Sequence, residues 1–332
     1  MEKFSKSNVA REYRDKHGME MPTQRLAKIM FSENKKLFYN VEDARDALRY
    51  IEGKKGRSLG SKIIRESKYF KAEERPRNVY NLPESDEIEY KTFKLKSTRT
   101  AIISDIHVPY HSVSALTTAL DFIKAEKPDT ILILGDLLDF YQLSNFNKDP
   151  RKRNFASEIQ MACEVIKIIQ DKIGAKVVYK FGNHSARYRN YIFQRAAALA
   201  GFEDFELETI IKKRIPEITI VDDKILIDAN ELTLLHGHEF GKSMFSPVNI
   251  ARGLFLRGKS NAICGHHHRT SSHVERTLKE KMIATWSIGC LSELHPDYLP
   301  INNFNHGFAM LDLGKTTGFE VRNYSIYKGK VM

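Results

Sequence analysis

From residue 100 onwards, apolar runs and amphipathic stretches follow one another along the chain. The short apolar runs predict buried strands, and the stretches with apolar residues at helical spacing predict helices. We expect strands at residues 101–104, 130–134 and 176–181, and helices from Ser112, over 157–173 and over 185–200. This order predicts a largely parallel sheet, with groups for binding and catalysis at the carboxyl ends of its strands.

Further apolar runs predict four later strands, over residues 232–235, 261–264, 282–288 and 308–313. The connections between these later strands are shorter than those between the first ones. We therefore expect a second sheet that packs on the first one. This arrangement predicts an α/β sandwich and not an open, doubly wound sheet.

The first 52 residues have the pattern of three short helices. Ser7 and Asn40 are suitable N-caps for the first and the third of these helices. The third helix carries Arg45 and Arg49 on one face, so the segment resembles a basic helix-turn-helix module that binds DNA. A small helical bundle that docks on the main domain or forms an oligomer fits the same pattern.

Residues 53–96 are predicted to link the helical module to the main domain. Their first part, residues 53–60, is basic and rich in glycine, which is typical of a flexible linker. A short helix is expected over residues 61–71, and an acidic patch follows at residues 84–87. The main domain is therefore expected over residues 97–332.

The composition is ordinary for a soluble globular protein, with 42% apolar and 29% charged residues in a chain of 332. We find neither an apolar run long enough to span a membrane nor a secretory signal. The three cysteines lie far apart in apolar contexts, which predicts reduced, buried thiols and a cytoplasmic location. These residues are Cys163, Cys264 and Cys290.

The formal charge of +11 is distributed unevenly along the chain. Residues 1–77 contain 20 Lys and Arg against 12 Asp and Glu, which is +8, so the other 255 residues carry +3. A basic arm on a nearly neutral body predicts a polyanionic partner, most simply nucleic acid. The alternative is a charged surface that only keeps the protein soluble.

Residue types that bind metals follow five of the predicted strands. Carboxylate and imidazole ligands suit Mn, Fe, Zn or Ni better than Ca or Mg. The neighbouring glycines allow sharp turns and a close approach of the backbone to a ligand. Each motif alone is weak evidence, but five in succession are hard to obtain by chance. The motifs are Asp105-Ile106-His107, Gly135-Asp136-Leu137-Leu138-Asp139, Gly182-Asn183-His184, His236-Gly237-His238 and Gly265-His266-His267-His268.

The order of these motifs resembles the calcineurin-like metallophosphoesterase family over roughly residues 98–332. The resemblance implies a four-layer α/β/β/α sandwich with two divalent metal ions, Mn²⁺ being the first expectation and Fe, Zn or Ni the alternatives. It also implies that a hydroxide between the two ions attacks phosphorus in line. Carried over by position, the first ion would bind Asp105, His107 and His268, the second Asn183, His236 and His266, and Asp136 would bridge them.

The same resemblance implies that His184 stabilises or protonates the leaving oxygen and that Asp139 orients this histidine. The alternative for Asp139 is a helix N-cap. Arg187 and Arg189 can hold a phosphate or stack on a base, although both also fit a helix surface. His238 is a further candidate for contact with the substrate.

The sequence departs from the protein serine/threonine phosphatases of this family. Asp139 is followed by Phe140-Tyr141 instead of Arg-Gly, and His184 is followed by Ser185 instead of an acidic residue. The combination with an N-terminal helical module resembles family members encoded by bacteriophages and prophages. We therefore expect a protein that works in the cytoplasm of a bacterium or of a phage-infected host.

These observations predict an enzyme that hydrolyses phosphodiesters of nucleic acid or nucleotides, which includes a nuclease. One alternative is a phosphomonoesterase that acts on nucleotides or proteins. Another is a DNA-binding protein whose phosphoesterase core is vestigial. The sequence leaves the oligomeric state open.

Overall fold

The computed structural model describes residues 5–52, 54, 82–83, 90–144, 149, 155–241, 248–314 and 318–332. The chain divides into two compact units, Met1–Glu87 and Ile88–Met332, and each is described by itself. Among the described helices, none is long and apolar enough to cross a membrane. The helix predicted over residues 61–71 lies outside the described residues.

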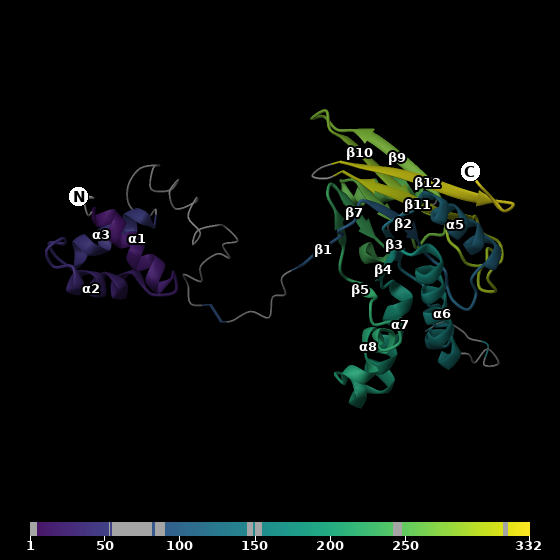
Figure 1. Ribbon diagram of the computed structural model, residues 1–332, viewed down its shortest axis with the longest axis horizontal. Coiled ribbons are helices and arrows are strands. Elements are labelled where there is room, and N and C mark those ends of the chain that lie inside the picture. Colours follow the sequence, from purple (N-terminus) through teal and green to yellow (C-terminus); the bar gives the residue numbers. More distant parts are fainter. Residues whose placement is uncertain are drawn as a thin grey trace. The chain divides into compact units, whose positions relative to one another are not determined.

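The N-terminal unit consists of α1 (Lys6–His17), α2 (Thr23–Glu33) and α3 (Val41–Ile51), so the prediction of three helices is confirmed (Figure 1). Asn40 caps α3 as predicted, since its side chain accepts a hydrogen bond from the backbone N–H of Asp43. The prediction that Ser7 caps α1 is wrong, because Ser5 accepts from Asn8 N instead. The three helices enclose a small apolar core that includes Leu26, Met30, Phe38 and Leu48.

The first sheet of the C-terminal unit has seven strands in the order β13-β12-β11-β2-β3-β4-β5. β2 to β5 run parallel, whereas β11 joins β2 antiparallel, with Ala309 opposite Ile102. The expectation that residues 308–313 belong to the second sheet is therefore wrong. The strands are β2 (Arg99–Ile103), β3 (Thr130–Leu134), β4 (Lys176–Lys180), β5 (Thr219–Val221), β11 (His306–Leu313), β12 (Phe319–Tyr327) and β13 (Lys330–Val331).

The predicted second sheet is confirmed and has six strands in the order β1-β6-β7-β8-β10-β9. Its edge strand β1 pairs with β6 and lies inside the segment predicted as a linker. The strands are β1 (Phe93–Lys94), β6 (Ile227–Ala229), β7 (Leu232–Leu235), β8 (Ala262–Cys264), β9 (Ser271–Arg276) and β10 (Met282–Ser287).

Helices cover the outer faces of both sheets, which completes the predicted four layers. Side chains alternate along each strand, so Ile103 packs toward α5 and α6 while Ile102 packs between the two sheets. On the far side, Leu254 of α9 packs on Leu235 and Cys264 of the second sheet. The helices of this unit are α5 (Val113–Glu126), α6 (Phe155–Ile173), α7 (Asn183–Arg195), α8 (Leu207–Lys212) and α9 (Ile250–Gly258).

Short 3₁₀ turns connect several of these elements, namely η1 (Tyr141–Leu143), η2 (Ala197–Leu199), η3 (Glu203–Phe205) and η4 (His238–Phe240). The predicted bounds hold for β3 and β7, and the helix predicted from Ser112 begins at Val113, with Ser112 as its N-cap. The helix predicted from residue 185 begins at Asn183. As a result, Asn183 and His184 both stand in the first turn of α7, directly after β4.

Candidate metal centre

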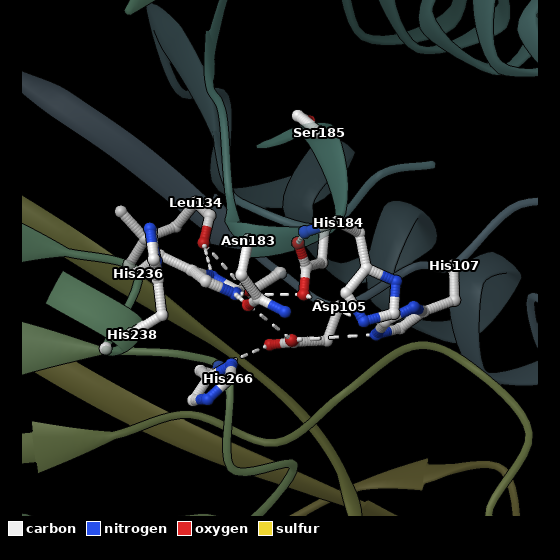
Figure 2. A network of polar contacts seen from close by, with 12 residues as sticks. Asp105, His107, Leu134, Asn183, His184, Ser185, His236, His238 and His266 are labelled. Atoms are coloured by element: carbon white, nitrogen blue, oxygen red, sulfur yellow. Dashed lines mark hydrogen bonds and ion pairs between the residues drawn. The ribbon is translucent and has the colours of Figure 1, made fainter. Parts of the chain in front are cut away.

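The predicted ligands meet above the carboxyl ends of β2, β3, β4, β7 and β8. Backbone hydrogen bonds hold neighbouring loops in register there, from His107 N to Asp136 O (3.0 Å) and from Gly265 N to His236 O (2.9 Å). Adjacent parallel strands end at the same edge of a sheet, so five segments far apart in sequence reach one point. Figure 2 shows Asp105 between His107 on one side and His236 and His266 on the other.

The backbone is left-handed at five of the seven predicted ligand positions. The φ angles are +55° at Asp105, +52° at His107, +45° at Asp136, +67° at His266 and +54° at His268. Residues other than glycine rarely adopt this conformation, and such strain is concentrated at functional sites. These backbone conformations therefore cost free energy, and they direct the ligand side chains toward one another.

Three glycines make the room that these side chains occupy. A Cβ atom on Gly182 would lie 2.2 Å from Asp136 Oδ1, and one on Gly265 would lie 2.7 Å from Asp105 Oδ2. At Gly135, where φ is +97°, a Cβ would lie 2.0 Å from His236 Nδ1. No side chain is tolerated at these distances, so the glycines in the motifs are steric requirements of the site.

The first cluster consists of Asp105, His107 and His268, all of them buried. The two Nε2 atoms of His107 and His268 face each other at 3.2 Å, and Asp105 Oδ1 lies 3.3 Å from His268 Nε2. Two nitrogens bound to one metal at ~2.0–2.1 Å in tetrahedral geometry stand ~3.3 Å apart. Asp105 Oδ1 is buried and has no hydrogen-bond partner among the described residues. The cluster therefore fits a cation.

The second cluster consists of Asp136, His236 and His266, with Asn183 beside it. His236 Nδ1 lies 2.8 Å from the backbone oxygen of Leu134, which must accept its proton, so a neutral ring presents a lone pair at Nε2. That Nε2 lies 3.0 Å from Asp136 Oδ2 and 3.2 Å from Asn183 Oδ1. Three acceptor atoms thus converge, which again fits a cation.

In each of the two aspartates, one carboxylate oxygen accepts a hydrogen bond from the backbone and the other faces the site. Asp105 Oδ2 accepts from His266 N at 2.9 Å, and Asp136 Oδ1 accepts from His184 N at 3.0 Å. The other oxygen of each side chain faces the histidines. Asp105 Oδ1 lies 4.0 Å from His236 Nε2, so the two clusters adjoin.

The buried carboxylates give the site a negative potential, which positive charge must balance. Burial alone would lower the pKa of His107 and His236, but the neighbouring carboxylates outweigh it and raise both pKa values to about 9. At His266, by contrast, burial dominates, and together with the neighbouring His236 it lowers the pKa to about 3. Either protons or metal ions must balance the aspartates.

His184 and Asp139 lie together beside the first cluster. His184 Nδ1 lies 2.7 Å from the backbone oxygen of Asp139 and 3.3 Å from its carboxylate. The same carboxylate lies closer to His107 Nδ1, at 3.0 Å. Asp139 thus fixes the rings of two histidines, and its link to His184 runs mainly through its backbone.

The three residues predicted to contact the substrate differ in their distance from His184. Arg187 stands three residues after His184 on α7, so it shares a helix face with it, and its guanidinium lies 2.9 Å from His184 Nε2. Arg189 faces elsewhere and binds the carboxylate of Asp223 at 2.8 Å. His238 lies 3.9 Å from Asp223 as well. Only Arg187 therefore contacts the predicted catalytic histidine.

An ion pair that supports the site was not anticipated. Lys180 is fully buried at the end of β4 and forms an ion pair with Glu239 at 3.0 Å. Glu239 in turn accepts hydrogen bonds from the backbone N–H groups of His236 (2.9 Å) and Gly237 (2.6 Å). This pair fixes the loop that carries His236. No local pattern reveals it, because the two residues are far apart in sequence.

Glu158 on α6 is a further buried acid near the site that was not anticipated. Its side chain accepts a hydrogen bond from the backbone N–H of Phe140, which follows Asp139 and is itself left-handed, with φ +51°. Burial raises the pKa of Glu158 to about 7. The helical spacing of α6 predicts a helix, but it does not reveal which turn this glutamate supports.

The chain belongs to the calcineurin-like phosphoesterase family, whose model matches residues 98–285. Members of this family use divalent metal ions. The Gene 54 protein of Mycobacterium phage L5 is 25% identical over 229 residues, which cover 65% of this chain and 89% of that protein. The Gene 54 protein of Mycobacterium phage D29 is 26% identical over 180 residues, 52% of this chain and 70% of that one. The resemblance to phage-encoded members is thereby confirmed.

Solved structures with remote similarity include a Vps29 mutant from Entamoeba histolytica and YfcE, a phosphoesterase from E. coli. The first is 15% identical and covers 70% of this chain and 96% of that chain, with a TM-score of 0.37. The second is 18% identical and covers 64% and 88%, with a TM-score of 0.32.

Proposed function

We propose that this protein is a dinuclear, metal-dependent phosphoesterase that hydrolyses phosphodiesters of nucleic acid or nucleotides. The observation that carries the proposal is the convergence of carboxylate, imidazole and amide ligand atoms into two adjoining clusters. In the first cluster these atoms belong to Asp105, His107 and His268. In the second cluster they belong to Asn183, Asp136 and His236, with His266 alongside. One divalent ion for each cluster, with Asp136 shared, would satisfy all of them.

Divalent ions held there would neutralise phosphoryl oxygens and activate water as a nucleophile. The side chains of the protein then have to orient the ester and stabilise the leaving oxygen. We assign that task to His184, whose ring is fixed through Nδ1 and whose Nε2 is directed away from the backbone of Asp139. Arg187 adds a permanent positive charge 2.9 Å from that Nε2. Arg189 and His238 are placed less well for contact with the phosphate.

The distribution of charge favours a polyanionic substrate and indicates which segment would bind it. Residues 53–77 contain 9 Lys and Arg against 3 Asp and Glu, whereas residues 1–52 contain 11 against 9. The basic character of the arm therefore belongs to the segment after the helices. In α3, moreover, Arg45 already pairs with Glu42 at 3.0 Å. We propose that residues 53–77 contact nucleic acid electrostatically.

An activity screen on the full chain tests the proposed reaction. The protein is stripped with a chelator, reloaded with Mn²⁺, and assayed with bis-p-nitrophenyl phosphate, p-nitrophenyl phosphate, and single- and double-stranded DNA. We expect diester hydrolysis that requires the metal and is lost in Asp136→Asn. Preference for the monoester together with inertness toward DNA would establish a phosphomonoesterase instead. Activity that survives in Asp136→Asn, or protein without bound metal, would support a vestigial core.

Binding to DNA is tested separately, with the full chain at several salt concentrations. Changing the Lys and Arg of residues 53–77 to Gln should weaken binding and flatten its dependence on salt. The matched control changes three exposed lysines of the helical unit, Lys16, Lys28 and Lys35. Weaker binding in the control alone would assign the contact to the helices.

A further inference from the structure

A cavity of about 220 Å³ opens directly beside the first cluster. His107, Asp139 and His268 are among the residues that line it, so a group in the cavity would adjoin a phosphate held at the metal centre. Sites for drug-sized ligands usually measure ~300–1,000 Å³. The cavity is therefore suited to one compact group and not to a length of polymer.

Three tyrosines give the cavity an aromatic lining. The rings of Tyr110 and Tyr141 stand 6.3 Å apart at 70°, which is an edge-to-face arrangement. The hydroxyl of Tyr141 accepts a hydrogen bond from the backbone N–H of Asp149 at 2.8 Å, which fixes the ring from outside. Tyr298 also lines the cavity, and this residue is 70% exposed. Aromatic rings of this kind offer faces on which a planar ligand can stack.

The wall that carries Tyr110 is tied to the metal centre by backbone hydrogen bonds. Glu293 N donates to Tyr110 O at 2.9 Å, and Ser112 N donates to Leu291 O at 2.8 Å. Leu291 N in turn donates to the backbone oxygen of Asp105 at 3.1 Å. The cavity and the first cluster thus belong to one hydrogen-bonded framework, so a ligand in the cavity has a defined position relative to the metal.

The charges around the cavity decide what kind of group enters it. Besides Asp139, the side chains of Glu293 and Asp297 line it, and both of these are carboxylates. A planar group with N–H donors could stack on the tyrosines and donate to the carboxylates. A nucleobase has these properties.

We propose that this cavity, the tyrosine pocket, binds the base of the nucleotide whose phosphate is hydrolysed. This inference rests on the proposed phosphoesterase function and specifies its substrate as an ester with a nucleoside next to the scissile phosphate. The pocket would accept one base, so it would position the end of a chain, a dinucleotide or a cyclic nucleotide.

Kinetics with two diesters test the tyrosine pocket in the Mn²⁺-loaded protein. One substrate is a dinucleoside phosphate, and the other is glycerophosphocholine, which has no aromatic ring. Stacking contributes ~1–3 kcal/mol per base, so Tyr141→Leu should reduce the ratio of the two kcat/KM values about tenfold, mainly through KM. Tyr141→Phe keeps the ring and should retain most of the ratio. An equal fall for both esters, or no fall, overturns the proposal.

Two further measurements keep the test independent of folding and of the proposed reaction. Tyr298→Leu changes an exposed side chain and should lower the same ratio without disturbing the fold. Binding of free adenosine and cytidine, followed by NMR on the metal-free protein, should weaken at least about fivefold in both leucine variants. Nucleoside binding without hydrolysis would contradict only the enzymatic function. Diester hydrolysis without nucleoside binding would overturn the pocket alone.

Discussion

Buried charge in the helical unit and in the metal centre is balanced in different ways. In the helical unit, the Arg14 side chain is almost fully buried, and all three nitrogens of its guanidinium donate hydrogen bonds. It forms an ion pair with Glu52 and donates to the backbone oxygens of Gly18 and Met21. In the metal centre, by contrast, the buried carboxylates face imidazole rings, as Asp136 Oδ2 faces His236 Nε2 at 3.0 Å, so protons on the rings or metal ions must balance their charge.

This difference separates charge that supports a fold from charge that is kept for a ligand. A buried group is costly unless it is paired, so a complete set of partners indicates a structural role. A cluster of carboxylates and imidazoles without a paired positive side chain is stable only when metal ions or protons supply the positive charge. The strained backbone at Asp105 and Asp136 points the same way, since the helical unit shows no comparable left-handed residues among those described outside glycine.

The largest effect is expected from Asp136→Asn. Metal ions supply several kcal/mol of transition-state stabilisation, so the loss of the shared carboxylate should lower kcat/KM on the order of 10³-fold. Metal content, measured by mass spectrometry, should fall as well. The matched control is Asp312→Asn, which removes a carboxylate paired with Arg99 and Arg322 far from the site. Equal losses in both variants would indicate general destabilisation.

The next effect concerns the helical unit. Arg14→Met leaves Glu52 buried with Lys54 as its remaining ionic partner at 2.8 Å. Breaking a buried pair by removing one partner costs ~3–5 kcal/mol, so the helical unit should unfold at a lower denaturant concentration. Diester hydrolysis by the other unit, followed with bis-p-nitrophenyl phosphate, should be unaffected. A loss of metal binding in this variant would show that the two kinds of buried charge are coupled.

A third effect is expected from Glu239→Gln, which weakens the pair that fixes the His236 loop. Loss of a partner outside the metal ligands typically lowers metal affinity ~10–100-fold. Titration with Mn²⁺ should show this loss at one site per chain, because only the second cluster depends on that loop. Adding Lys180→Met removes the unpaired buried lysine, so thermal stability should recover while the metal affinity stays low. An unchanged affinity in Glu239→Gln would assign Glu239 a purely structural role.

The smallest effect is a pH dependence of the helical unit. Burial would raise the pKa of Glu52, but the hydrogen bonds from Lys54 and Arg14 outweigh it and lower the pKa below its usual value of 4.5. This stabilisation is therefore complete above the usual value and is lost as the pH falls through the lowered pKa. Denaturant titrations between pH 7 and pH 3 should show the loss in the wild type. The same dependence in Glu52→Gln would assign it to other groups.

Much of this molecule could be predicted from its sequence, because the strongest signals are local. Dense apolar runs bounded by polar residues gave the bounds of β3 and β7, and the ligand motifs directly follow the strands. The pairing of strands is not local. For this reason β11 was expected in the wrong sheet, although its partner β2 lies about 200 residues earlier in the chain.

Side-chain direction is another feature that the sequence does not reveal. Arg187 and Arg189 looked equivalent in the sequence, but two residues along a helix rotate a side chain by about 200°. Arg187 accordingly faces His184, while Arg189 faces Asp223. The left-handed backbone of the ligand loops and the pair of Lys180 with Glu239 depend on contacts between distant segments, which no local pattern contains.

A crystal structure of the full chain grown with Mn²⁺ would show whether the two clusters bind metal ions. Anomalous scattering locates the ions without reference to activity. We predict two peaks, one among Asp105, His107 and His268 and the other among Asn183, His236 and His266, with Asp136 in contact with both. A single peak, or none while the facing histidines remain bonded to the aspartates, would contradict the proposed dinuclear centre.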